Sequence, residues 1–351
     1  MAIPYSRYLM GNLPWYSTLI VIGAIVALWL ASLEEKRLAL PKDTFVDLSL
    51  WLIPMGILGA RLYYVCMQWD QYANRLWAIF AIWEGGIAIY GAVIAGVIVV
   101  SIYAKRKKYA FFALADCLAP GLLLAQAIGR WGNYFNMEAY GTVIVDHAWQ
   151  FFPFGVLIAS GEGYTWHMAT FFYESLWNFI GFMLLWCNRK KQKVVGNTSL
   201  WYVILYGSGR FIIEQLRTDS LYIGGVRASQ WLSFVLCLVA IVLLLCKNQR
   251  NITQQKRFYL VLSIGALLCR WLFLSSPIGY ALSVDIFVVG VVLLYRLRVS
   301  WWLLVPLVVE SILIFLPSLL LRTILCSVTV PLYVYGLLQI PTGGASCPAD
   351  T

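Results

Sequence analysis

Six charged side chains lie within or at the ends of strongly apolar stretches of this sequence. They are Arg61, Glu84, Arg130, Arg210, Glu214 and Arg217. A charge inside an apolar membrane costs free energy and by default marks a functional site. Arginine suits a phosphate group, because its planar fork bonds two oxygens and it stays charged at any reachable pH. These residues therefore predict a site for an anionic group.

Four polar residues recur at helical spacing near the end of the sixth apolar stretch. Intervals of four, four and three residues separate Tyr206, Arg210, Glu214 and Arg217. Such spacing stacks side chains along one face of a helix, so this helix is predicted to present a polar stripe to the protein interior. The alternative is structural: Glu214 pairs with both arginines and only makes their charges tolerable.

A second polar group lies in residues 129–141, GRWGNYFNMEAYG, at the end of the fourth apolar stretch. Irregular polar backbone at the end of a membrane span is typical of a lined cavity rather than of a lipid-facing loop. Glycines also let a backbone turn sharply or approach a ligand closely. The segment contributes Arg130, Asn133, Asn136 and Glu138, with glycines at 129, 132 and 141.

The elements that position these residues are predicted to be membrane-spanning helices. Hydrophobic residues make up 61% of the chain and charged residues 12%, whereas soluble proteins carry about 25% charged residues. Lipid tolerates only helices or closed barrels, and apolar stretches near 20 residues indicate helices. We expect an all-α, polytopic bundle with a seven-helix core at residues 15–33, 46–68, 85–104, 111–129, 170–187, 199–216 and 228–246. Residues 258–274, 281–296 and 300–340 would add three or four spans.

Basic residues predict the orientation of this bundle. They gather in every second loop, at 36–42, 105–108, 189–193 and 247–257. The positive-inside rule places these loops in the cytoplasm and the N-terminus outside, so the charge of +10 does not indicate a nucleic-acid partner. The long segment 130–169 then lies outside, and a phospholipid headgroup is the anion available to the arginines. Residues 1–257 form the predicted core, and residues 258–351 form an extension of open role.

The eight cysteines predict no metal centre or disulfide framework. Most of them lie in or beside the apolar stretches, and their spacing matches neither kind of site. A free cysteine in a helix behaves as a small apolar residue. No metal and no cofactor are expected.

Residues 129–141 closely resemble the signature of the prolipoprotein diacylglyceryl transferases, Gly-Arg-x-Gly-Asn-Phe-x-Asn-x-Glu-x-x-Gly, with only the aromatic at Tyr134 differing. Other segments resemble the family in the same order, so the resemblance covers about residues 10–250. They are Trp15-Tyr16, Gly59 to Leu62 with Tyr64, Trp83 to Gly91, Phe172 to Glu174, Tyr206 to Arg217 and Ser229-Gln230.

The resemblance implies the first step of lipoprotein maturation in the bacterial cell membrane. The diacylglyceryl group of phosphatidylglycerol passes to the lipobox cysteine of a prolipoprotein, a thioether forms and glycerol phosphate leaves. The active site would face the outer leaflet. The thiol must be activated, because cysteine with a pKa of about 8.5 is mostly protonated at neutral pH.

Residue roles follow from the resemblance. Arg130 and Arg210 would bind phosphate and stabilise the leaving group. Asn133 and Glu138 would orient headgroup or glycerol hydroxyls, and Glu214 would fix the arginine geometry. The other predicted substrate-binding residues are Tyr16, Arg61, Tyr64, Gly141, Tyr206 and Arg217.

Tyr90 stands where most family members have histidine, in Tyr90-Gly91-Ala92 rather than His-Gly-Gly. A tyrosine is a poorer base unless an adjacent cation lowers its pKa. Tyr90 is therefore a catalytic candidate, either as a base or as a hydrogen-bond partner while an arginine favours the thiolate.

Two other functions remain open. Buried arginines also suit a phospholipid transporter or scramblase, although such a site belongs near the midplane of the membrane. A retargeted paralogue of the transferase is the second, suggested by Tyr90 and by the added spans.

Overall fold

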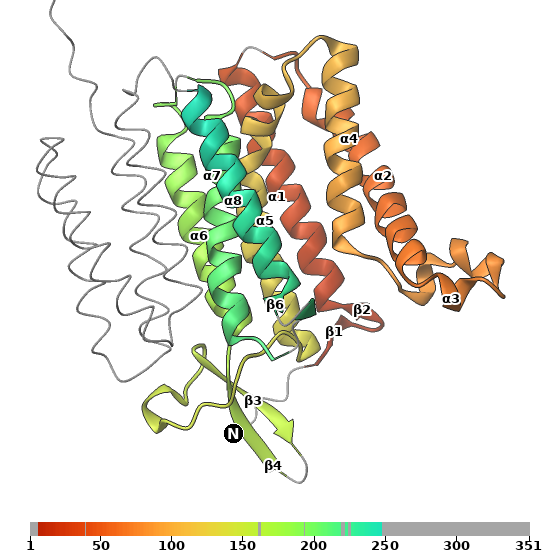
Figure 1. Ribbon diagram of the computed structural model, residues 1–351, viewed down its shortest axis with the longest axis vertical. Coiled ribbons are helices and arrows are strands. Elements are labelled where there is room, and N and C mark those ends of the chain that lie inside the picture. The colour runs from red at the N-terminus through yellow and green to blue at the C-terminus, as the bar shows by residue number, and fades with distance from the viewer. Residues whose placement is uncertain are drawn as a thin grey trace, which may run out of the picture. The chain divides into compact units, whose positions relative to one another are not determined.

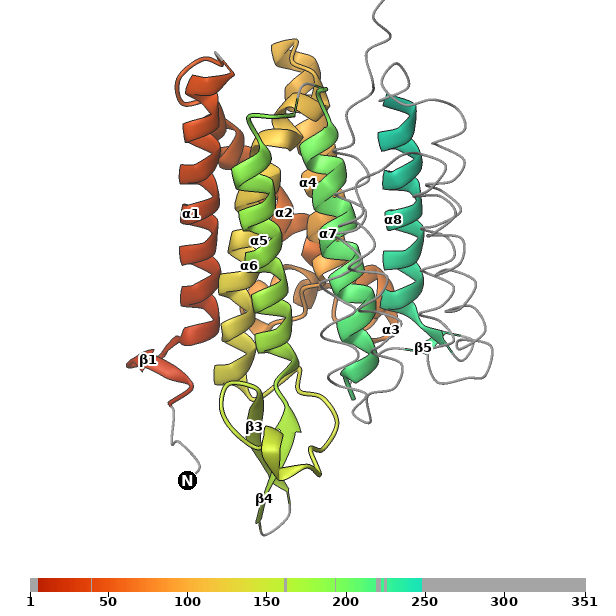
Figure 2. The ribbon, with the colours of Figure 1, turned by 90° about the vertical axis from the view of Figure 1, so that its left-hand side faces the viewer.

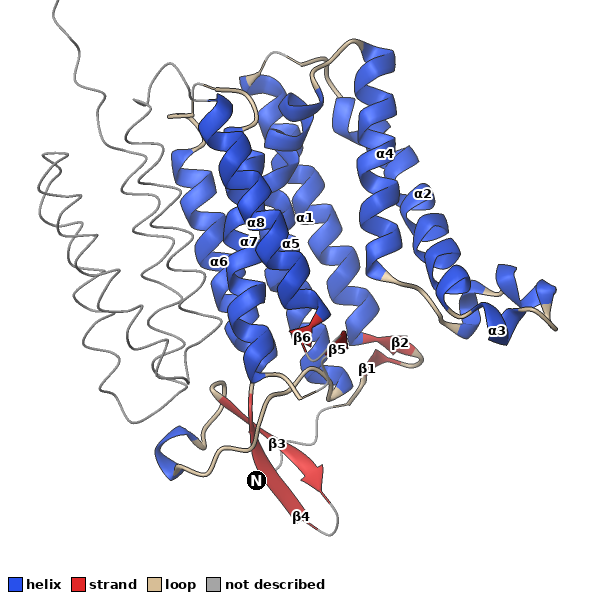
Figure 3. Cartoon of the chain, in the orientation of Figure 1, coloured by secondary structure: helices blue, strands red, loops and turns tan. Residues whose placement is uncertain are grey.

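The computed structural model describes residues 6–38, 40–160, 163–192, 194–218, 222–223 and 226–247. The predicted extension at 258–351 lies outside these residues. The described chain is mostly helical, with three short two-stranded hairpins (Figure 3). Its long helices are α1 (Trp15–Arg37), α2 (Thr44–Met67), α4 (Ile89–Lys107), α5 (Phe111–Asn136), α6 (Thr170–Asn188), α7 (Asn197–Ile213) and α8 (Ala228–Lys247). The short helices are α3 (Trp69–Tyr72), η1 (Leu76–Phe80), η2 (Ile82–Glu84), η3 (His147–Trp149) and η4 (Glu214–Leu216).

Four helices in the described residues are long and apolar enough to cross a membrane. They are α1, α2, α4 and α5. A shorter apolar helical stretch covers Ala228–Leu244. The mostly helical chain with these candidate spans fits the predicted all-α membrane protein.

The chain divides into two compact units. The N-terminal unit contains Tyr8–Gly132 and Phe182–Ser199. The C-terminal unit contains Asn133–Gly181 and the described residues from Leu200 to Lys247, together with Ser6 and Arg7. Each unit has its own packing.

Small residues allow close helix packing in the N-terminal unit, where Figure 1 shows α2 and α4 side by side. A Cβ on Gly59 of α2 would overlap the Ala95 side chain of α4. Between α1 and α5, a Cβ on Gly121 would lie 2.9 Å from Ala27 Cα. These glycines let paired helices approach closely, as small residues do in membrane proteins.

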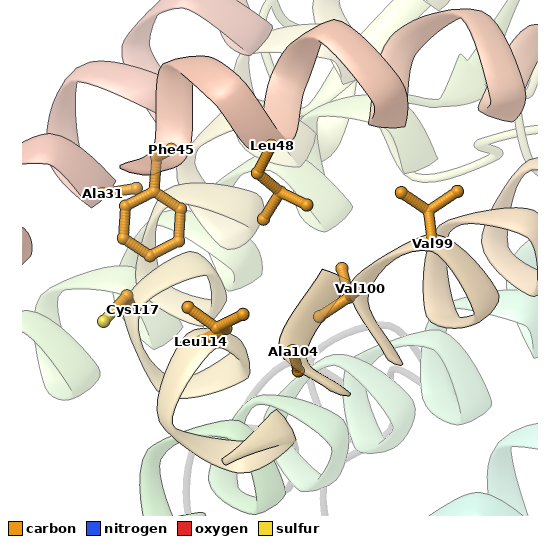
Figure 4. Close-up of a cluster of buried hydrophobic side chains, with 8 residues drawn as sticks. All are labelled: Ala31, Phe45, Leu48, Val99, Val100, Ala104, Leu114 and Cys117. Atoms are coloured by element: carbon orange, nitrogen blue, oxygen red, sulfur yellow. The ribbon is translucent and has the colours of Figure 1, made fainter. Parts of the chain in front are cut away.

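A buried cluster joins these helices near their lysine-rich ends (Figure 4). Phe45 and Leu114 are fully buried within it. Polar contacts surround the same end: Arg189 Nε donates to Glu34 Oε1 at 2.8 Å, and Asp116 accepts from the backbone N–H groups of Gly196 and Ser199. The basic loops after α1, α4 and α6 therefore share one end of this unit. The buried cluster consists of Ala31, Phe45, Leu48, Val99, Val100, Ala104, Leu114 and Cys117.

The C-terminal unit contains a β-hairpin that the sequence reasoning did not predict. Strands β3 (Gly155–Ser160) and β4 (Gly163–Met168) pair antiparallel, from Gly155 opposite Met168 to Ser160 opposite Gly163. Figure 2 shows the hairpin beyond the first turn of α6. The smaller hairpins are β1 (Tyr8–Met10) with β2 (Leu13–Pro14) and β5 (Tyr222–Ile223) with β6 (Val226–Arg227).

Several predicted helix boundaries were wrong. The fourth long helix, α5, continues to Asn136 rather than ending at 129, so Arg130, Asn133 and Asn136 lie on a helix and not in irregular backbone. The third long helix begins at Ile89 rather than 85, because Gly85 and Gly86 have φ of +86° and +72°, a conformation that an α-helix excludes. The sixth ends at Ile213 rather than 216, and a 3₁₀ turn, η4, follows it.

Candidate active site

A buried ion-pair network in the C-terminal unit centres on Arg210. Its Nη1 lies 3.1 Å from Glu174 Oε2 of α6, and its Nη2 lies 2.9 Å from Glu214 Oε2. The two carboxylate side chains are only 3% and 4% exposed. One guanidinium thus pairs with two buried carboxylates on different elements, a geometry that suits the fork of arginine.

Two further arginines approach Glu214. Arg217 Nη1 lies 3.9 Å from its Oε2, and Arg227 Nη1 donates to its backbone carbonyl. The network contains three guanidinium groups and two carboxylates, those of Glu174 and Glu214, so its net charge is positive. Such a cluster can attract an anion.

The predicted stripe along one helix face was partly wrong. Tyr206 and Arg210 lie on α7, but Glu214 lies in η4. Arg217 follows in extended conformation, with φ −79° and ψ 147°. The predicted pairing of Glu214 with both arginines is present, although the helix ends before it.

The chain just after α5 folds back on the last turn of that helix, and the contact is made by the carboxylate of Glu138. Asn133 Nδ2 donates to Glu138 Oε1 at 2.8 Å, and Asn136 Nδ2 approaches the same oxygen at 3.3 Å. Met137 and Ala139 have φ of +53° and +55°, the left-handed region that reverses the chain direction after a helix. Glu138 is exposed while Asn133 is buried.

Backbone contacts dock this segment against Arg217. Gly141 forms an isolated antiparallel bridge with Arg217. Its N–H donates to Met168 O at 2.8 Å, and its carbonyl lies 2.8 Å from His167 Nδ1. A Cβ on Gly141 would lie 2.7 Å from Leu216 O, so a glycine is required for this approach. The side chain of His167 thus contributes to this junction.

The C-terminal unit therefore brings together seven of the predicted residues. Tyr206 lies one turn before Arg210 on α7, and its ring stacks on Tyr202 with centroids 6.0 Å apart. The group comprises Asn133, Glu138, Gly141, Tyr206, Arg210, Glu214 and Arg217.

The other predicted residues belong to the N-terminal unit. Tyr16 lies in the first turn of α1 and packs on α5, where a Cβ on Gly132 would lie 2.7 Å from its ring. Arg130, also on α5, is partly exposed. Tyr90, in the first turn of α4, is 42% exposed, and its ring centroid lies 6.3 Å from that of Tyr63.

Arg61 and Tyr64 form a separate group on α2, in which Arg61 is buried and Tyr64 is partly buried. Arg61 is 3% exposed, and its guanidinium binds backbone carbonyls of residues 78–86. Tyr64 meets Tyr72 edge-on, with ring centroids 6.4 Å apart. The side chain of Glu84 lies outside the described part of the structure.

Sequence reasoning missed two members of the Arg210 network. Glu174 is an acidic residue within the apolar stretch of α6, and that position alone could have identified it. Arg227 precedes α8, and no spacing rule connects it to Glu214. Among the described residues, no three His, Cys, Asp or Glu side chains gather as a metal ion would require.

Comparison with known proteins identifies a family. Residues 7–246 match the family model described as prolipoprotein diacylglyceryl transferase. A phosphatidylglycerol–prolipoprotein diacylglyceryl transferase of Oceanobacillus iheyensis is 44% identical over 241 residues, which cover 67% of this chain and 84% of that protein.

Two streptococcal proteins of the same name give similar matches. The Streptococcus agalactiae protein is 40% identical over 244 residues, covering 68% of this chain and 93% of its own. The Streptococcus pneumoniae protein is 43% identical over 241 residues, covering 68% and 90%. The matched region includes both groups of predicted residues.

Proposed function

The chain belongs to the prolipoprotein diacylglyceryl transferase family, and from this membership we infer that it transfers the diacylglyceryl group of phosphatidylglycerol to prolipoproteins. It is a membrane-embedded transferase, and its activity is the first step of lipoprotein maturation. Its relatives of this name align over 84% to 93% of their length, so the resemblance extends across the family core.

The reaction joins the lipobox cysteine to the lipid and releases a phosphate ester. A C–S bond forms between the thiolate and the glycerol carbon, and the bond from that carbon to the phosphate oxygen breaks. The thiol loses its proton, and glycerol phosphate leaves as an anion. The protein must therefore activate a thiol and stabilise negative charge on the leaving group.

The Arg210 network is the observation that best supports this chemistry. Arg210 is held from both sides by Glu174 and Glu214, so its guanidinium is pre-organised before substrate binds. Fixed donors aimed at developing charge need no reorganisation during the reaction. Arg210 and Arg217 would bind the phosphate, and Glu214 would orient them.

The segment docked beside Arg217 would recognise the rest of the headgroup. Glu138 already accepts from Asn133 and is exposed, so it can also accept from glycerol hydroxyls. Gly141 would let this segment lie close to Arg217 and to the ligand. Tyr206 would line the same site.

In this proposal Arg130 would bind the phosphate, and Tyr16 and Tyr64 would contact the lipid. Tyr90, which is exposed at the start of α4, would contact the acceptor thiol or the headgroup. In this proposal seven helices cross the plasma membrane, and the site faces the outer leaflet. The shared basic end of α1, α4 and α6 supports that orientation.

Reconstitution with defined substrates tests the proposal. The purified chain in phosphatidylglycerol vesicles should add one diacylglyceryl group to a lipobox peptide, as measured by mass spectrometry. Vesicles of phosphatidylethanolamine alone and a Cys→Ser peptide are the controls. Lipid movement between leaflets without peptide modification would refute the transferase and indicate a scramblase.

Arg130→Ala and Arg210→Ala should each abolish transfer while the protein still inserts. Their insertion is checked by protease protection in membranes. Near-normal turnover in either variant would remove that residue from the mechanism. Tyr90→Phe tests the proton chemistry: if transfer survives, the hydroxyl is not the base.

A further inference from the structure

The guanidinium of Arg61 uses all of its N–H groups on the protein backbone. Arginine has five such groups, one on Nε and two on each terminal nitrogen. Each meets a carbonyl oxygen, so none is left for a phosphate. The acceptors are Ile79 at 2.9 Å from Nε, Gly85 and Gly86 at 2.5 and 2.9 Å from Nη1, and Ala78 and Ala81 at 2.5 and 3.2 Å from Nη2.

These carbonyls belong to a segment of short turns, in which the carbonyl of Ala78 also accepts the backbone N–H of Ala81 at 3.1 Å. Residues 76–84 form two short 3₁₀ turns, η1 and η2, and Gly85 and Gly86 follow with positive φ. The final carbonyls of a helical turn lack partners within it. An unsatisfied carbonyl inside a membrane protein is costly, so a buried arginine that binds five carbonyls of this segment stabilises it.

The same segment determines where α4 begins. Ala88 N–H donates to Ala60 O at 3.1 Å, one residue before Arg61. A Cβ on Gly91 would overlap the Gly59 carbonyl, so α2 and α4 are in close contact there. Tyr90 lies between these two contacts. Its place on α4 thus depends on the segment that Arg61 holds.

We propose that Arg61 is a positioning residue, which fixes residues 78–86 and thereby places Tyr90, and that it does not bind the substrate phosphate. The proposal rests on the proposed transferase function only for its catalytic consequence. Its structural part concerns the order of one segment and is measured without substrate.

Hydrogen–deuterium exchange of the purified chain in detergent tests the structural part. Arg61→Ala and Arg61→Lys should each increase the exchange rate of amides in residues 78–91 at least tenfold, because an ammonium cannot reach five carbonyls. Arg75→Ala is the matched control, since it removes an exposed arginine from the same segment and should leave exchange unchanged. Exchange at the control level in both Arg61 variants overturns the proposal.

A second variant disturbs the arrangement without touching the arginine. A Cβ on Gly86 would lie 2.6 Å from Arg61 Nη1, and Gly86 has φ of +72°. Gly86→Ala should therefore reproduce the faster exchange while the positive charge remains. Gly96→Ala on α4, whose Cβ would make only an ordinary 3.7 Å contact, is its control. If Gly86→Ala behaves like this control, Arg61 does not act through the segment.

Steady-state transfer separates positioning from substrate binding. The Arg61 and Gly86 variants should lower kcat at least tenfold and change KM for phosphatidylglycerol less than threefold. A raised KM with unchanged kcat would instead show direct binding and overturn the proposal. If the wild-type chain shows no transfer, the proposed function fails, whereas the exchange measurements still decide the positioning role.

Discussion

Arg210 is the residue on which the buried charge of the C-terminal unit depends most. Its two terminal nitrogens pair with carboxylates from α6 and from the turn after α7. Its presence within an apolar stretch was evident from the sequence. Its pairing with Glu174 was not predicted, because the two residues lie 36 positions apart in the sequence and only the fold brings them together.

Replacing Arg210 with lysine tests whether transfer needs only a positive charge or also the planar guanidinium. An ammonium cannot form the two directed contacts of the guanidinium. We expect Arg210→Lys to lower kcat/KM about a hundredfold or more, in the range seen when one transition-state donor is removed. Peptide lipidation measures this effect. Activity within threefold of wild type would show that the charge alone suffices.

Loss of the charge should also reduce stability. Arg210→Ala leaves two buried carboxylates without their main partner, which costs about 3–5 kcal/mol in comparable cases. Adding Glu174→Gln should recover part of the unfolding midpoint in detergent but no transfer. Recovery of transfer in this double variant would contradict the role of Arg210.

Asn178 is a buried polar residue with a different status. It is 1% exposed on α6, one turn after Glu174, and in the described structure neither of its polar atoms has a hydrogen-bond partner. An unsatisfied buried amide costs about 1–3 kcal/mol. Asn178→Leu should therefore raise the unfolding midpoint in detergent.

The matched change is Asn178→Asp, which should lower the midpoint because it buries a charge. A lower midpoint for Asn178→Leu as well would show that the amide has a partner. Reduced transfer by a more stable Asn178→Leu variant would show that the amide contacts substrate.

At the scale of elements, α6 and α7 pack together where the indole ring of Trp177 lies against Gly209. Trp177 Nε1 donates to Leu205 O at 2.6 Å, and a Cβ on Gly209 would overlap the indole. Gly209 immediately precedes Arg210. The distance between the two helices at this point therefore controls whether Arg210 reaches Glu174.

Gly209→Ala should separate α6 from α7 near the ion pair. We expect a stability loss of about 1–3 kcal/mol, as for other overpacked sites, and a transfer rate reduced at least tenfold. Gly56→Ala on α2 is the control, because its Cβ would meet nothing within 4 Å. Equal rates for the two variants would show that this helix contact does not position Arg210.

The helices were the most predictable elements, and their ends were less so. Length and apolar composition define a membrane helix, so α1, α2, α5 and α8 begin within about two residues of their predicted starts. The Gly85–Gly86 pair could have signalled the later start of α4. The β3–β4 hairpin was missed, although its strands are rich in β-branched and aromatic residues, because the segment was interpreted only as an outer loop.

At the scale of the whole molecule, the region shared with relatives ends well before the chain does. The family model stops at residue 246 of 351. The relatives from O. iheyensis and S. agalactiae align over most of their own length but over only 67% and 68% of this chain. The catalytic residues proposed here all fall within the shared part.

Removal of residues 258–351 should therefore leave the transfer activity largely unchanged. A chain truncated after Arg257 is expected to lipidate the peptide at a rate within about threefold of the full chain, when equal amounts of inserted protein are compared. The full chain carrying Arg210→Ala is the inactive reference. A truncated chain that inserts but falls to that reference would show that the extension takes part in catalysis.

The bridge between Gly141 and Arg217 also constrains when the site can come into existence. Seventy-five residues separate these positions, and His167 joins the same junction from a third place in the chain. His167 and Met168 precede α6, whereas Leu216 and Arg217 follow α7, so the junction is still incomplete while the ribosome is translating α6. The partners of residues 141 and 142 therefore become available in two stages, residues 167 and 168 first and residues 216 and 217 later.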